Sequence, residues 1–149
     1  MKRRLAREIV VQSLYQMEMN QVTSEEAVAM LLSEAGEEND TERVITDEPQ
    51  LTSYVLELVD GTWSHKVAID DLLAQYLKGW QMSRLSKVDR EVLRLAAYEM
   101  LYREDVPAKV VINEAIELSK HFGTDESGKF VNGVLGNMIR ELEKLRSKK

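Results

Sequence analysis

Apolar side chains recur at intervals of three and four residues through most of the chain, which is the spacing of one face of an α-helix. This period starts in residues 3–19. Thr23 and Glu26 then form a capping-box pattern, which predicts a second helix ending at Gly36. The apolar face of the first helix is made of Leu5, Ile9, Val10, Leu14 and Met17. The start of the chain therefore predicts two amphipathic helices.

The helical period resumes after residue 48. Pro49 opens a long helical stretch that reaches about Leu77, and Gly61 is expected to kink or break it. Residues 146–149 are expected to fray. The remaining predicted helices follow capping residues or a proline and lie at 86–102, 107–121 and 124–145. The pattern predicts six to eight helices and no strand.

The composition supports one all-α domain over residues 1–149. Two prolines and seven glycines are fewer than sheet proteins need, and short connections favour an antiparallel bundle. With no cysteine and two histidines, disulfides and cysteine-bound zinc are excluded and no metal or other cofactor is expected. No apolar run approaches the roughly 20 residues of a membrane span, and the basic N-terminus lacks the apolar stretch of a signal peptide. We therefore expect a cytoplasmic protein.

Charge is distributed unevenly along the chain. The net charge is −6, yet residues 1–20 carry four basic and two acidic side chains, while residues 21–50 carry one basic and nine acidic side chains. The acidic excess is concentrated near residues 37–48, a polar and aperiodic segment that we expect to be a mobile loop. Exposed charges more than about 8–10 Å apart are screened at physiological salt, so a basic N-terminal site is compatible with an acidic protein.

No enzymatic site is recognisable in the sequence. There is no glycine-rich nucleotide-binding motif and no local nucleophile signature. The acid pairs Asp70-Asp71 and Asp125-Glu126 are interpreted as structural, because neighbouring helix residues point about 100° apart. His65 is predicted on a polar side and His121 at a helix C-terminus. The sequence therefore predicts a protein that is not an enzyme.

The first predicted helix is the best candidate binding site. Arg3, Arg4 and Arg7 lie in its first turns, and arginine forks can grip phosphates. At about 100° per residue, Tyr15 projects within about 20° of Arg4 and about 80° from Arg7. A tyrosine ring can stack on an unpaired base. The alternative is an exposed basic turn with Tyr15 as a half-buried packing residue, and the helix alone does not decide between them.

Lys129 and Phe130, near the start of the last predicted helix, are a second candidate. Phe130 continues into the apolar face through Val134, which favours a packing role. If the first and last helices adjoin, the two patches could form one surface for single-stranded nucleic acid.

Three stretches together resemble the NusB family of bacterial transcription antitermination factors. The first is RRLARE at 3–8 with QSLY at 12–15, and the second is VDREVLRLAAYEM at 88–100. The third combines DVP at 105–107, VINEAIELSK at 111–120, FG at 122–123 and KFVNGVL at 129–135. The resemblance covers nearly the whole chain and is least clear at residues 21–50.

The resemblance implies an all-helical fold of about seven helices in two packed subdomains. It also implies a non-enzymatic protein that binds the boxA element of ribosomal RNA leader transcripts, together with the ribosomal protein NusE, in the RNA polymerase antitermination complex. The family's RNA-binding positions match Arg3, Arg4, Arg7, Tyr15, Lys129 and Phe130. Asp89 and Glu126 match the surface offered to RNA and NusE.

The match is incomplete in places. Residues 37–48 have no clear counterpart, and the alignment slips by a residue at Trp80 and Met82. A related domain precedes ribosomal RNA cytosine methyltransferases, but that activity is not implied for a chain ending here. The alternative to an RNA-binding factor is a helical protein-interaction adaptor, or a homodimer, without direct RNA binding.

Overall fold

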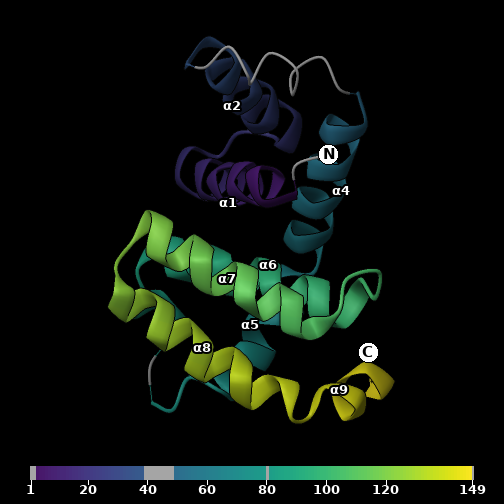
Figure 1. Cartoon of the computed structure of the whole chain (residues 1–149), viewed down its shortest axis with the longest axis vertical. Coiled ribbons are helices and arrows are strands. Elements are labelled where there is room, and N and C mark those ends of the chain that lie inside the picture. Colours follow the sequence, from purple (N-terminus) through teal and green to yellow (C-terminus); the bar gives the residue numbers. More distant parts are fainter. Residues whose placement is uncertain (1–2, 39–48, 80, 149) are drawn as a thin grey trace. The chain divides into compact units, whose positions relative to one another are not determined.

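The computed structural model describes residues 3–38, 49–79 and 81–148, and over these ranges every regular element is a helix. The predicted all-α class is therefore confirmed, with eight α-helices among the described residues. Figure 1 shows α1 (Arg3–Asn20), α2 (Ser24–Glu38), α4 (Pro49–Ser64), α5 (Lys66–Ala74), the 3-10 helix η2 (Met82–Arg84), α6 (Lys87–Tyr102), α7 (Ala108–Phe122), α8 (Asp125–Ile139) and α9 (Leu142–Lys148). None of the described helices is long and apolar enough to cross a membrane.

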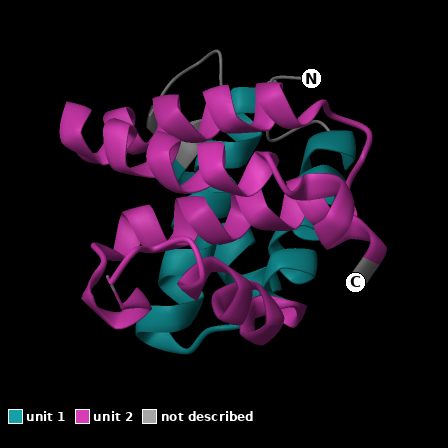
Figure 2. Ribbon diagram, turned by 90° about the horizontal axis from the view of Figure 1, so that it is seen from below, with its two compact units in different colours: residues 1–63 teal, residues 64–149 magenta. Residues whose placement is uncertain are grey.

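The chain divides into two compact units, residues 1–63 and residues 64–149 (Figure 2). In the first unit α1 packs against α2. The predicted capping box is present, because Thr23 Oγ1 accepts from the Glu26 amide at 3.1 Å and Glu26 Oε1 accepts from the Thr23 amide at 3.3 Å. Helix α2 continues past the predicted stop at Gly36, and residues 39–48 of the predicted loop lie outside the described residues.

Helix α4 does not break at Gly61, contrary to the sequence prediction. It continues to Ser64, with Val59 and Thr62 buried on either side of the glycine. A glycine inside a helix costs only about 1 kcal/mol relative to alanine, so buried neighbours can hold the helix together. The break falls at His65, the N-cap of α5, one residue after the start of the second unit at Ser64.

Helix α6 forms the centre of the second unit. Every residue from Glu91 to Leu101 is buried, as expected for a helix surrounded by others, and α5, α7, α8 and α9 all contact it. Its start matches the predicted cap, since Ser86 Oγ accepts from the Asp89 amide at 3.1 Å. Figure 1 shows α7 in front of α6, with α8 running beside α7.

Arg94, a buried residue of α6, joins α6 to α5 through an ion pair with the half-buried Asp70. Its guanidinium donates to both carboxylate oxygens of Asp70, at 2.8 and 2.7 Å, and to Glu91 at 3.2 Å. Arg94 and Glu91 are almost fully buried. A bidentate arginine–carboxylate pair of this kind fixes geometry as well as charge. The structural role predicted for Asp70 is thus the one observed.

The last described residues form helix α9, which bonds to residues in and after α6. Arg146 Nε donates to the carbonyl oxygen of Met100 at 3.0 Å, and Arg146 Nη1 lies 3.3 Å from Glu104 Oε1. Helix α9 reaches Lys148, and Lys149 lies outside the described residues, so fraying of the tail stays a prediction. These long-range bonds to the end of α6 hold α9 in place.

Candidate nucleic-acid interface

The start of α1 exposes Arg3 and Arg4, as the sequence predicted. The first turn of this helix contains no acidic residue, so its arginines add to the positive end of the helix dipole. Arg3 Cζ lies 5.7 Å from the ring centroid of Tyr54 on α4, within range of a cation–π contact. One of the exposed guanidinium groups is therefore held over an aromatic face of the same unit.

Arg7 differs from the other two arginines, because it is buried whereas Arg3 and Arg4 are exposed. Only 2% of its surface is exposed. On a helix with about 100° per residue, Arg7 lies about 60° from Arg4 toward the apolar side and only about 40° from Val11, which is itself buried. The apolar arc of α1 is wider than the pattern of large apolar residues suggests, and Arg7 falls inside it.

Tyr15 is half-buried. It is neither sealed in the interior nor fully exposed, so part of the tyrosine remains at the surface on the side of α1 that carries Arg4. This degree of burial fits both a packing role and a stacking role. Packing and base stacking, the two roles that the sequence suggests for Tyr15, therefore both remain.

Helix α8 carries the second pair of candidates. Its start is capped as predicted, with Thr124 Oγ1 accepting from the Ser127 amide at 3.3 Å. Lys129 is exposed and its Nζ lies 3.4 Å from Glu126 Oε1, with 75% and 83% of the two side chains exposed. An ion pair so open to water contributes only about 0–1 kcal/mol, so it does not tie up the lysine. Phe130 is half-buried.

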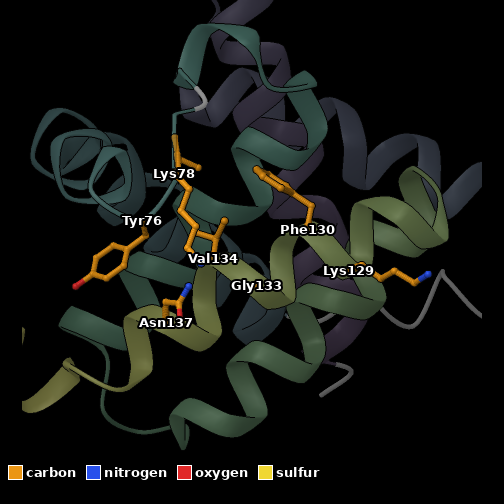
Figure 3. Close-up of a pocket in the computed structure, with 8 residues that line it drawn as sticks. Tyr76, Lys78, Lys129, Phe130, Gly133, Val134 and Asn137 are labelled. Atoms are coloured by element: carbon orange, nitrogen blue, oxygen red, sulfur yellow. The ribbon is translucent and has the colours of Figure 1, made fainter.

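Phe130 borders a pocket of about 230 Å³ that we call the basic pocket. Figure 3 shows its labelled residues on two segments, with Phe130 and Asn137 on α8 and Tyr76 and Lys78 on the chain that follows α5. Lys129 points away from these residues, at the rim. None of the described side chains that line the pocket is acidic. The lining consists of Tyr76, Leu77, Lys78, Lys129, Phe130, Gly133, Val134 and Asn137.

Phe130 also borders a second pocket, of about 340 Å³, that we call the acidic pocket. Asp89 and Glu126, the two predicted partner-binding residues, both line it, together with one arginine, Arg84. Asp89 is 8% exposed, and its Oδ1 has no hydrogen-bond partner within the described part of the chain. The other lining residues are Leu85, Ser86, Thr124 and Ser127. The fold thus brings Asp89, Glu126 and Phe130 to one site.

Tyr76 supplies a fixed wall of the basic pocket. Its hydroxyl donates to Glu141 Oε1 at 2.5 Å. Partial burial, and then this bond to a carboxylate, raise the pKa of Tyr76 to about 12. The phenol is therefore neutral at physiological pH.

Sequence patterns did not single out most of the residues that line these pockets, including two cations and one amide. Lys78 and Asn137 line the basic pocket, and Arg84 lines the acidic pocket. Lys78 and Asn137 are 59 positions apart, and no local spacing relates them. The pair Lys78-Gly79 resembles an ordinary helix stop, so only the fold reveals that its lysine lines the same pocket as Phe130.

The arrangement is that of a binding protein. Aromatic and charged side chains surround open surface pockets, and no described group of carboxylates and histidines could hold a metal ion. The class that the fold and the sites define is a helical binding protein.

The chain belongs to the NusB family, whose model matches residues 4–140. A transcription antitermination protein NusB from Exiguobacterium sp. is 45% identical over 95% of this chain and 99% of its own length. T. maritima NusB has a TM-score of 0.80 and 37% identity, covering 95% of this chain and 92% of that one. A chain from the crystal structure of antitermination factors NusB and NusE in complex with dsRNA has a TM-score of 0.75 at 22% identity, over 99% and 97% of the two chains. The chain is therefore an antitermination factor of this family.

Proposed function

We propose that this protein binds boxA-type single-stranded RNA of ribosomal RNA leader transcripts together with the ribosomal protein NusE, and so prevents premature termination by RNA polymerase. The observation that carries the proposal is the position of Phe130 between a basic and an acidic pocket. Nucleic acid needs cations and an aromatic face, whereas a basic protein partner needs carboxylates. A NusB chain solved with NusE and dsRNA is similar in fold.

The RNA contacts are divided between the two units. Lys129 would hold a phosphate beside the basic pocket, and Phe130 would stack on a base, because single-strand binders combine cations with aromatic platforms. Arg3 and Arg4 would hold further phosphates, with Tyr15 beside them as a second stacking ring. Arg7 is too buried to reach a phosphate in this conformation, and its role is to support the start of α1.

The acidic pocket would receive a basic side chain of NusE. Asp89 carries the argument, because its Oδ1 is buried without a hydrogen-bond partner among the residues described. A buried carboxylate oxygen left unpaired is costly, and a lysine or arginine from a partner would satisfy it. The carboxylate of Glu126, at the exposed rim of the acidic pocket, would attract the basic side chain electrostatically over a longer range.

Binding of RNA and of NusE would be coupled through Phe130. A partner bound in the acidic pocket restricts the motion of the Phe130 ring, which also borders the basic pocket. Less conformational entropy is then lost when RNA binds. By linkage, RNA raises the affinity for NusE by the same factor. The protein acts in the cytoplasm, where bacterial RNA is transcribed.

A filter-binding titration tests the proposal. The full chain is titrated against a boxA leader RNA and a scrambled RNA of equal composition, each with and without NusE. We expect preference for boxA, tighter binding with NusE, and a fall of roughly 0.7 log unit in affinity per log unit of salt for each phosphate contact. Equal weak binding to both RNAs would contradict the proposal and favour the adaptor or homodimer.

A further inference from the structure

Asn137 offers an unused amide to the basic pocket. The residue is half-buried on α8 and lines the pocket, and its side chain makes no hydrogen bond to any described residue. A side-chain amide carries two donors and an acceptor at once. That combination matches the edge of a nucleobase, whose donors and acceptors lie side by side.

Tyr76 cannot take that role, although it lines the same pocket. Its proton is already donated to Glu141, so the hydroxyl is committed within the protein. Apart from Tyr76 and Asn137, the described residues that line the pocket are apolar residues, a glycine and two lysines. Asn137 is therefore the lining side chain that has both hydrogen-bonding functions available.

Lys78 is held in an uncommon backbone conformation at the opposite side of the pocket. Its φ is 49°, in the left-handed region that residues other than glycine rarely adopt, and Gly79 follows with a φ of 93°. Left-handed backbone outside glycine is strained and concentrates at functional sites. Lys78 is exposed and forms no ion pair within the described ranges, so its charge is available to a ligand.

The size of the pocket limits its occupant. Its volume of about 230 Å³ is below the roughly 300–1,000 Å³ of pockets that enclose a whole drug-sized ligand, so it suits one flat ring whose backbone stays outside. Phe130 provides the aromatic face and Lys78 the cation.

We propose that the basic pocket binds one unpaired nucleotide of the RNA, with its base on Phe130, its edge hydrogen-bonded to Asn137 and its phosphate held by Lys78. This proposal rests on the proposed function, because it assigns specificity within the same RNA site. Asn137 is then the residue that reads a base, and Lys78 the one that fixes where the strand enters.

The test of Asn137 uses a panel of fluorescent boxA leader RNAs, each with one base replaced, and measures anisotropy with the full chain. Asn137→Ala is expected to weaken boxA binding about tenfold, as for the loss of a good base contact. In this variant, replacing the base at one RNA position should no longer weaken binding, whereas replacements at the other positions should weaken binding as they do in the wild-type chain. The control is Asn113→Ala, an exposed asparagine on α7 that lines neither pocket. Thermal melting confirms that both variants are folded.

The test of Lys78 is the salt dependence of the same binding. Lys78→Gln keeps the length of the side chain and removes its charge, so the slope of log affinity against log salt should fall by roughly 0.7. Lys109→Gln, at an exposed lysine of α7 outside both pockets, should leave the slope unchanged.

The outcomes separate this proposal from the proposed function. If the wild-type chain prefers boxA RNA while Asn137→Ala keeps the full pattern of base penalties, the pocket does not read a base and the inference fails alone. An unchanged slope in Lys78→Gln likewise removes the phosphate contact. If the wild-type chain itself does not distinguish boxA from the scrambled RNA, the proposed function fails and the inference fails with it.

Discussion

The start of α1 and the start of α8 both carry predicted RNA contacts, but they are built differently. The start of α1 presents Arg3 and Arg4 with no acid in the first turn. The start of α8 contains two acids, Asp125 and Glu126, and places Phe130 between two pockets of opposite charge. Contacts to phosphates position a nucleic acid, whereas contacts to bases specify its sequence. We therefore assign affinity to the α1 site and specificity to the α8 site.

The largest effect is expected at Phe130. Phe130→Ala should cost about 1–3 kcal/mol of boxA binding, because one base loses its stacking platform. Phe130→Leu keeps apolar packing against Val134 and should lose most of the same affinity. Filter binding gives the affinities, and equal melting temperatures establish that the fold survives. Wild-type affinity in the leucine variant would show that the ring packs but does not stack.

Arg7→Ala tests whether the buried arginine contributes to stability, in contrast to the exposed Arg3 and Arg4, which are expected to bind RNA. The variant should lower the free energy of unfolding by roughly 1–3 kcal/mol, since a buried side chain and its packed stem are removed. Urea denaturation measures this loss. The salt slope of RNA binding should stay at the wild-type value, and a flatter slope would mean that Arg7 reaches a phosphate after a rearrangement of α1.

Replacing Arg3 and Arg4 together by alanine tests the affinity site. The salt slope should decrease by roughly 0.7 for each lost phosphate contact, and binding should weaken equally for boxA and scrambled RNA. Anisotropy titrations at several salt concentrations measure both effects. A selective loss of boxA binding would reverse the assignment of affinity to α1 and specificity to α8.

The smallest effect concerns Tyr76, at the wall of the basic pocket. Its pKa of about 12 in the folded chain exceeds the ordinary value of 10, so folding favours the protonated phenol. The resulting stabilisation is fully present below pH 10 and is lost as the pH rises toward 12. Melting temperatures between pH 9 and 12 should fall more steeply for the wild-type chain than for Tyr76→Phe. Parallel curves would show that the bond to Glu141 contributes nothing to stability.

Local signals in the sequence predicted most of the fold. The capping residues Thr23, Ser86 and Thr124 mark helix starts because each bonds to an amide three residues later. Errors arose where distant contacts dominate. Buried neighbours carry α4 through Gly61, where the sequence pattern predicted a kink or a break.

The candidate site was predictable in its residue types and less so in its geometry. The family resemblance pointed to Asp89, Glu126 and Phe130, and the fold brings these three to one pocket. The burial of Arg7 depends on the width of the apolar arc of α1, which one sequence leaves ambiguous. Asn137 carries no motif, and only the packing of its helix beside the chain after α5 gives it a possible role.

The most direct test of the account is the coupling between RNA and NusE. The boxA affinity is measured with and without saturating NusE, for the wild-type chain and for Phe130→Ala. The account predicts that NusE tightens RNA binding to the wild-type chain and that this gain disappears in the variant, because the shared ring is gone. An equal gain in both proteins would contradict the claim that Phe130 joins the two sites.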